Sequence, residues 1–238
     1  MQAKHGIAKL PFLQNHCCIA FMSSAARPHQ PDTVASLAAV DIRCQRGERT
    51  LFSGLELSLE RGQCLHIAGA NGSGKTTLLR TVCGLRKADE GHVRWQGKDI
   101  NDNHDFARAV AYLGHKDGLK DALSPAENLQ FYQQLDGVLN TTLIDSTLQR
   151  MQLLQCADLA TVNLSFGQRR RLAFARLLLQ RKSLWILDEP FTGIDIAGRD
   201  LVEQICLEHL AADGMILLTS HQSLDHSSLA SATRVVTL

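Results

Sequence analysis

The chain has 238 residues, of which 45% are hydrophobic and 21% are charged, and its formal net charge is +1. This length fits one large domain that buries a sizeable core. The near-neutral charge argues against a dedicated nucleic-acid-binding protein, which usually carries a strongly basic face. The sequence contains no run of about 18 apolar residues that would span a bilayer as a helix. Any role at a membrane therefore requires docking onto another protein.

Residues 1–33 differ in composition from the rest of the chain. No Asp or Glu precedes Asp32, and the apolar stretch 10–22 is interrupted by a Gln-Asn-His triplet, which makes it a poor signal-peptide core. A transit peptide is the alternative, although the segment has only one arginine. We expect residues 1–33 to be a disordered extension, and residues 34–238 to form the folded domain.

The seven cysteines are an odd number and lack the spacing of a metal site. Several lie within apolar segments, where a free cysteine behaves as a small hydrophobic residue. These are Cys44, Cys64, Cys83 and Cys206. We predict reduced thiols with neither a metal-binding nor a disulfide role.

From Val34 onward, short apolar runs predict β-strands. The runs cover residues 38–44, 55–59, 64–68, 92–95, 109–113, 184–187, 215–219 and 234–238. The last of them alternate with helical stretches, which favours βαβ units and a parallel sheet. Residues 117–162 read as helical, and Ser124-Pro125-Ala126-Glu127 has the pattern of a capping box with proline at the first helical position. We therefore expect an α/β core that is interrupted by a helical insertion.

A glycine-rich loop follows the apolar run 64–68 and opens a helix predicted over 75–83. It fits the pattern GxxxxGK[ST], in the strand–loop–helix context that the pattern requires. Successive backbone N–H groups of such a loop bind phosphate oxygens, Lys75 supplies a point charge, and the Thr76 hydroxyl ligates Mg²⁺. The predicted nucleotide-binding residues are Gly69, Ala70, Asn71, Gly72, Ser73, Gly74, Lys75, Thr76 and Thr77.

Two adjacent carboxylates follow the apolar run 184–187. A buried strand brings Asp188 to the carboxyl edge of the sheet, where ligands bind in open α/β folds. We expect Asp188 to hold Mg²⁺ and Glu189 to act as the general base on the attacking water. In isolation such a pair is as often a solvated loop charge, and the phosphate loop upstream favours the catalytic reading.

A second capping box is predicted at Leu164-Ser165-Phe166-Gly167-Gln168, where Ser165 would cap a helix with Gln168 at its third position. A helix N-terminus of this kind attracts an anion. The three arginines that follow, 169–171, would point in different directions around the helix. We interpret them as a solvated helix face with partners four residues away rather than as a nucleic-acid-binding patch.

These motifs together resemble those of the ATP-binding cassette (ABC) ATPases. The segment 164–168 resembles the signature motif, Asp195 lies in a segment that resembles the D-loop, and His221 resembles the switch histidine. The resemblance implies a P-loop NTPase core with a mixed or parallel sheet, an N-terminal antiparallel β subdomain and a helical subdomain at about 117–180. It also implies a head-to-tail homodimer that binds ATP and Mg²⁺ between two copies. The second copy would then contact the nucleotide through Ser165, Gly167, Gln168 and Asp195.

Two positions depart from the general pattern of the family. His115 stands where the family usually has a glutamine that senses the γ-phosphate, and we predict that it is a nucleotide-binding residue. The segment 43–51, upstream of the phosphate loop, lacks the aromatic residue that normally stacks on adenine. The planar guanidinium of Arg46 is a candidate substitute, and Phe52 reads as a core residue.

One subfamily is especially similar, the cytochrome c biogenesis ATP-binding export proteins, which are the ATPase subunits of a haem exporter. The resemblance covers roughly 35–238 and includes His115. It implies an ATP hydrolase, or translocase, located peripherally on the cytoplasmic face of the bacterial inner membrane, with the mitochondrial inner membrane as the alternative. The implied partners are integral membrane subunits of the CcmB and CcmC kind and a haem chaperone of the CcmE kind, with no nucleic acid. The alternatives are the ATPase of another ABC exporter or importer, or a soluble non-transport ABC ATPase.

Overall fold

The computed structural model describes residues 36–101, 103–221, 223–225 and 227–238. The predicted extension, 1–33, lies outside these residues. The first strands form an antiparallel sheet in the order β2-β1-β4-β5. Its strands are β1 (Leu37–Arg46), β2 (Arg49–Leu59), β4 (Glu90–Trp95) and β5 (Lys98–Asp99). Leu37 pairs with Leu59 on one side and with Trp95 on the other, and all three side chains are buried.

The second sheet is parallel throughout, with the strand order β6-β7-β8-β3-β9. Its strands are β3 (Cys64–Ala68), β6 (Val110–Leu113), β7 (Leu184–Asp188), β8 (Met215–Thr219) and β9 (Thr233–Thr237). Every residue of β7 and β8 is buried, as expected for parallel strands that are covered on both faces. Because parallel strands end at one edge, the segments that follow β3, β7 and β8 meet there.

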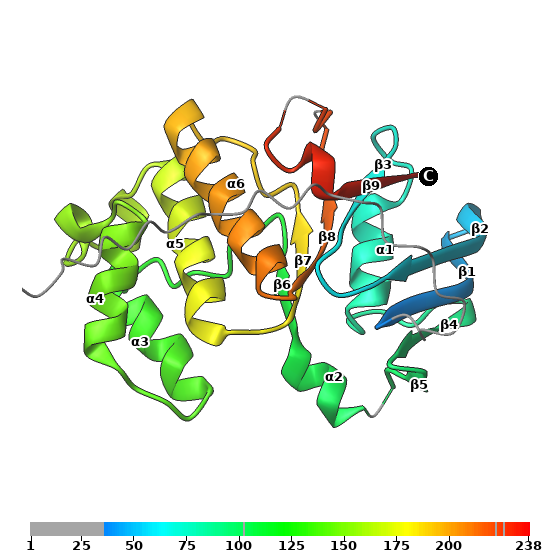
Figure 1. The fold of residues 1–238 in the computed structure, drawn as a ribbon, viewed down its shortest axis with the longest axis horizontal. Coiled ribbons are helices and arrows are strands. Elements are labelled where there is room, and N and C mark those ends of the chain that lie inside the picture. The colour runs from blue at the N-terminus through cyan, green and yellow to red at the C-terminus, as the bar shows by residue number, and fades with distance from the viewer. Residues whose placement is uncertain (1–35, 102, 222, 226) are drawn as a thin grey trace, which may run out of the picture. The chain divides into compact units, whose positions relative to one another are not determined.

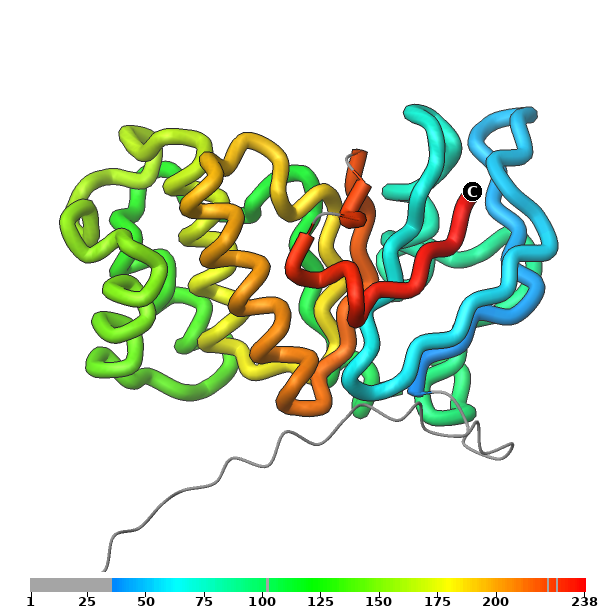
Figure 2. Tube along the Cα trace, turned by 45° about the horizontal axis from the view of Figure 1, so that its top comes forward, coloured from blue at the N-terminus to red at the C-terminus, as the bar shows by residue number. Residues whose placement is uncertain are grey.

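The helices are α1 (Lys75–Val82), α2 (His104–Ala109), α3 (Pro125–Leu135), α4 (Thr141–Arg150), α5 (Phe166–Gln180) and α6 (Ile196–Ala211). Helices α3 and α4 pack against α5 on the side opposite to the antiparallel sheet, and the parallel sheet lies between these two parts (Figures 1 and 2). Short 3₁₀ turns occur at residues 154–156, 161–163 and 230–232. Within the described residues, no helix combines the length and the apolar character needed to cross a membrane.

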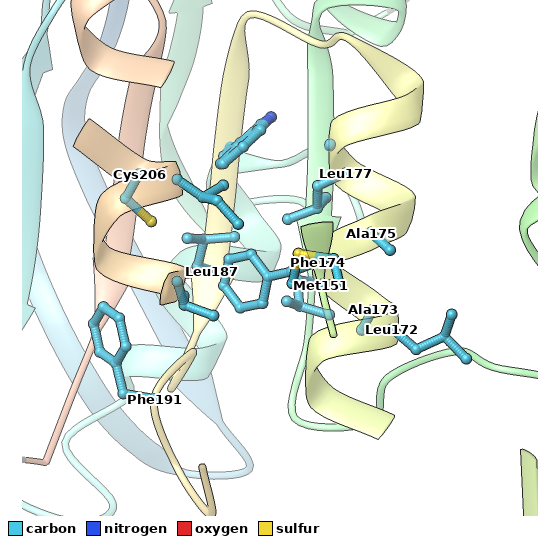
Figure 3. Packing of buried hydrophobic residues seen from close by; sticks show 14 of the residues in the cluster. Met151, Leu172, Ala173, Phe174, Ala175, Leu177, Leu187, Phe191 and Cys206 are labelled. Atoms are coloured by element: carbon cyan, nitrogen blue, oxygen red, sulfur yellow. The ribbon is translucent and has the colours of Figure 1, made fainter. Parts of the chain in front are cut away.

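Two apolar clusters hold these layers together. One joins α3, α4, α5 and α6 to one face of the parallel sheet, and Phe174 of α5, within this cluster, is completely buried. Figure 3 shows Phe174 pointing from α5 toward Leu187 of β7. The other cluster joins the antiparallel sheet to α1 and the opposite face of the parallel sheet. The α5 helix is therefore fixed to the strand that ends at Asp188.

The predicted α/β fold with a P-loop NTPase core is confirmed, and strands 64–68 and 215–219 have the predicted bounds. Both expected capping boxes are present, at Ser124 and at Ser165. Helix α2 and the two-residue strand β5 were missed. Helix α2 begins where the Asn103 side chain accepts hydrogen bonds from the N–H groups of Asp105 and Phe106, both at 3.1 Å. The cysteines within the described residues are free thiols.

Candidate functional site

The loop between β3 and α1 is shaped by glycines. Gly69, Gly72 and Gly74 all have positive φ angles. Gly74 is the N-cap of α1, and a Cβ there would lie 3.0 Å from the Phe52 ring and 3.1 Å from Leu51. Only glycine fits both this backbone and this space. Helix α1 therefore begins with its free N–H groups next to the loop, an arrangement that attracts phosphate.

Lys75, the first residue of α1, folds back over this loop. Its ammonium group donates hydrogen bonds to the carbonyl oxygens of Gly69 (2.7 Å) and Ala70 (3.1 Å). The side chain is 7% exposed, and no carboxylate within the described residues forms an ion pair with it. A buried cation without a carboxylate partner favours an anionic ligand.

Asp188 lies at the centre of a hydrogen-bond network at the edge of the parallel sheet. Its carboxylate accepts hydrogen bonds from the hydroxyl of Thr76 on α1 and from the hydroxyl of Thr219 on β8, both at 2.8 Å. The Thr219 hydroxyl in turn accepts a hydrogen bond from the backbone N–H of Glu189 at 3.1 Å. The carboxylate and the Thr76 hydroxyl form an oxygen donor set, which suits a hard cation such as Mg²⁺.

Glu189 follows Asp188 with a φ angle of 52°, in the left-handed region. A non-glycine residue in this conformation costs roughly 1–2 kcal/mol, so the surrounding bonds must hold it there. One Glu189 carboxylate oxygen contacts Nε2 of His221, and the other accepts a hydrogen bond from the Thr192 hydroxyl at 3.2 Å. The Glu189 side chain is 13% exposed, and that of His221 is 50% exposed. The carboxylate thus faces the histidine that follows β8.

A cavity of about 330 Å³ lies between the phosphate loop and the Glu189–His221 pair. It is lined by Asn71, Gly72, Gly74, Lys75, Thr76, Thr77, Glu189 and His221, together with Arg46 and Leu51. The structure thus brings Arg46, a candidate from the sequence, to the site. Leu51 and Thr219 were not singled out from the sequence. Thr219 lies two residues before His221 in the same motif, and this position could have identified it from the sequence. Nothing in the sequence pointed to Leu51.

The signature residues form a second group that does not line this cavity. Ser165 Oγ accepts a hydrogen bond from the N–H of Gln168 at 3.2 Å, and the Gln168 side chain accepts one from the Ser165 N–H at 2.8 Å. Asp195 caps α6 through the N–H of Gly198 at 2.9 Å. A Cβ on Gly167 would lie 3.3 Å from the carbonyl oxygen of Gly193. Among the described residues, the two segments therefore meet each other rather than the phosphate loop.

His115 does not reach the cavity. It is exposed, and it forms no hydrogen bond or ion pair with any described residue. His115 is thus not among the residues that line the cavity at the phosphate loop, and its role in nucleotide binding stays a prediction. A motif position fixes where a residue stands in the chain and leaves the direction of its side chain to the loop around it.

The interpretation of residues 169–171 as a solvated helix face is wrong. Arg169 forms ion pairs with Asp117 (3.0 Å) and Asp121 (2.6 Å). Arg171 donates to the carbonyl oxygen of Met151 at 3.0 Å. Arg170 is only 4% exposed, and burial lowers its pKa. The arginines do point in different directions, but their partners lie on other segments of the chain rather than one turn away on the helix.

Comparison with known proteins adds sequence relatives. The sequence pattern of the ABC transporter family matches residues 52–192. The "Cytochrome c biogenesis ATP-binding export protein CcmA" of Methylococcus capsulatus is 47% identical over 193 residues, which are 80% of this chain and 93% of the relative. The protein of the same name from Escherichia coli (strain K12) is 44% identical over 190 residues, 79% of this chain and 90% of the relative.

Solved structures share the fold. CbiO1 from Clostridium perfringens, described as part of the ABC transporter complex CbiONQ, has a TM-score of 0.70 at 24% identity, over 85% of this chain and 84% of that one. The ADP conformation of MJ1267, an ATP-binding cassette of an ABC transporter, has a TM-score of 0.68 at 23% identity, over 80% and 83%. The family match over more than half of the chain and the two sequence relatives show which family this is. The chain is a nucleotide-binding ATP hydrolase that belongs to the ABC transporter family and, within it, to the family of the cytochrome c biogenesis ATP-binding export proteins.

Proposed function

We propose that this chain is the ATP-hydrolysing subunit of a transporter complex for cytochrome c biogenesis, of the haem-transporting ATPase class, which exports haem or releases the haem-loaded chaperone. The observation that carries the ATPase part is the hydrogen-bond chain from Thr76 through Asp188 and Thr219 to the backbone of Glu189. It joins the phosphate loop, the acidic strand end and the segment before His221 around one cavity. The transport part rests on the names of the relatives.

Binding is assigned to the loop and to the oxygen donors beside it. Residues 69–77 would hold the phosphates through backbone N–H groups and the N-terminus of α1, and Lys75 would move from the loop carbonyls to the β- and γ-phosphates. Thr76 and Asp188 would hold Mg²⁺, which neutralises charge on the triphosphate when bound. Arg46 lines the same cavity, and its guanidinium plane would stack on adenine.

Hydrolysis is assigned to Glu189 and His221. The Glu189 carboxylate takes a proton from a water molecule while the water oxygen bonds to the γ-phosphorus. The bond from this phosphorus to the bridging oxygen breaks, and ADP keeps that oxygen. General-base catalysis of this kind contributes roughly 10²–10⁴-fold. His221 contacts the Glu189 carboxylate and keeps it turned toward the cavity.

A second copy of the chain completes the site in this proposal. Ser165, Gly167, Gln168 and Asp195 do not line their own copy's cavity, and the helix start at Ser165 is exposed. Two apolar side chains flank this group, Phe166 at 56% and Ile196 at 82% exposure. Pairing two copies head to tail would bury these side chains and bring the N-terminus of α5 to the γ-phosphate of the other copy.

The same proposal gives the chain membrane partners. With no membrane-crossing helix among the described residues, it would lie peripherally on integral subunits of the CcmB and CcmC kind, at the cytoplasmic face of the inner membrane. The haem chaperone of the CcmE kind would be the protein released by the ATP-driven cycle.

Purified full-length chain and its Lys75→Ala and Glu189→Gln variants test the ATPase assignment. We expect Mg²⁺-dependent ATP hydrolysis in the wild type and loss of turnover in both variants, with ATP binding retained only by Glu189→Gln. Glu56→Gln, an exposed carboxylate on β2, is the matched control and should keep full activity. Full turnover in both site variants would reject the assignment. Co-expression with CcmB- and CcmC-like subunits tests the transport part, which fails if no such subunit co-purifies.

A further inference from the structure

Arg170 is a buried arginine on α5, the helix that begins at the signature motif. It binds the backbone of residues 188–190, the segment that holds Asp188 and Glu189. The Arg170 guanidinium donates to the carbonyl oxygens of three consecutive residues: Asp188 at 2.7 Å, Glu189 at 2.8 Å and Pro190 at 3.2 Å. It also donates to the carbonyl oxygen of Gly114 at 3.0 Å. The side chain is 4% exposed and forms no ion pair with a described carboxylate. All of its hydrogen-bond partners among the described residues are therefore backbone carbonyls.

These carbonyls surround the residue whose backbone is strained. Glu189 has the left-handed φ of 52°, and its N–H is bound by the Thr219 hydroxyl on one side. On the other side, its carbonyl oxygen is bound by Arg170. The guanidinium also holds the carbonyls immediately before and after it, so a relaxation of φ at Glu189 would break several bonds to one buried cation. The planar fork of arginine suits this arrangement, whereas an ammonium group does not.

We propose that Arg170 is a positioning residue for ATP hydrolysis, which holds the Glu189 backbone in the conformation that turns the carboxylate toward His221 and the cavity. The inference rests on the proposed role of Glu189 as the general base. Because Arg170 lies on α5 and also binds Gly114, it connects the signature helix, the end of β7 and the end of β6 through one side chain.

The charges around Arg170 are consistent with this role. Burial lowers its pKa, and the carboxylates of Asp117, Asp188 and Glu189 act in the opposite direction and favour the charged form. The guanidinium remains protonated at any working pH, because an unperturbed arginine titrates far above neutrality. Its positive charge also lies near the two acidic residues of the site and reduces the repulsion between them.

The test compares Arg170→Gln with the wild type in ATPase kinetics and ATP binding. We expect kcat to fall by roughly tenfold to a hundredfold, the range caused by a small displacement of a catalytic group, while KM and ATP affinity stay near the wild-type values. Arg170→Lys should recover only a small part of the loss. Arg171→Gln is the matched control, because it removes the neighbouring arginine, whose carbonyl partners are Met151 and Gln152. It should leave kcat close to the wild-type value.

A further comparison separates positioning from a general loss of structure. In the Glu189→Gln background, Arg170→Gln should not lower the residual turnover further, because Arg170 acts through Glu189. A wild-type kcat in Arg170→Gln, an equal loss in Arg171→Gln, or an undiminished effect in the Glu189→Gln background would each overturn the proposal. Full turnover in Glu189→Gln alone is a different result, since it rejects the assignment of Glu189 on which the inference rests.

Discussion

Replacing Thr219 with valine is the sharpest test of how the site is held together. The two side chains have nearly the same shape, so the change mainly removes the hydroxyl. That hydroxyl is completely buried, donates to the Asp188 carboxylate at 2.8 Å and accepts from the Glu189 N–H at 3.1 Å. A hydrogen bond to a charged group contributes about 1.5–3 kcal/mol, and a buried N–H left without a partner costs about 1–3 kcal/mol. The expected loss of unfolding free energy is therefore about 2.5–6 kcal/mol.

Urea unfolding measures this loss as a lower midpoint at unchanged m-value. A loss of this size lowers the Tm by about 5–24 °C in a domain of this length. We also expect a lower kcat, because the backbone of Glu189 loses one of the bonds that hold its φ angle. Thr219→Ser should recover most of both properties, and Thr237→Val, an exposed change on β9, should stay within about 0.5 kcal/mol of the wild type. A Thr219→Val variant as stable as the wild type would refute the reasoning.

Two further predictions concern the parts around the site. Asn128 is completely buried; its amide oxygen accepts from the Lys120 N–H at 2.8 Å, and its amide nitrogen donates to the Thr161 hydroxyl at 3.0 Å. We expect Asn128→Leu to lower the unfolding free energy by about 2–4 kcal/mol in urea titrations, and an unchanged midpoint would contradict this. Burial lowers the pKa of His209, whose ring stacks on Trp185 at 3.9 Å. Below its unfolded pKa of about 6.5, the unfolded chain binds a proton that the folded chain does not, so stability falls as the pH falls. His209→Gln should lose less stability than the wild type between about pH 7.5 and pH 5.5, and equal losses would disprove this origin of the pH dependence.

The fold was predictable where the pattern of apolar residues in a segment matches the burial of that segment in the structure. Strands β3 and β8 are buried on both faces, so each reads as a continuous apolar run with clear ends. Helix α2 has only one buried residue, Phe106, and its start depends on the side chain of Asn103. Such a short segment has too little apolar periodicity to be recognised from sequence.

The site was predictable where neighbouring residues act together. The residues of the phosphate loop are contiguous, and Asp188 and Glu189 are the last residue of β7 and the residue after it. The spacing within each motif therefore already places these side chains close together. Arg170 and Thr219 acquire their roles from partners that lie 18 to 56 residues away along the chain. The residues next to Arg170 or Thr219 in the sequence do not indicate such long-range contacts. The solvated-face interpretation of residues 169–171 was wrong for the same reason.

The cap at Ser165 has a consequence for how this serine can recognise an anion. Its oxygen already accepts a hydrogen bond from the Gln168 N–H, which uses one lone pair and leaves the hydroxyl proton available for a hydrogen bond to another group. One atom can therefore terminate the helix and offer a proton to an incoming phosphate without breaking either bond. Threonine preserves both capacities and alanine loses both, whereas aspartate would keep the cap and repel the anion. A substitution at this position must therefore meet two simultaneous demands on a single oxygen.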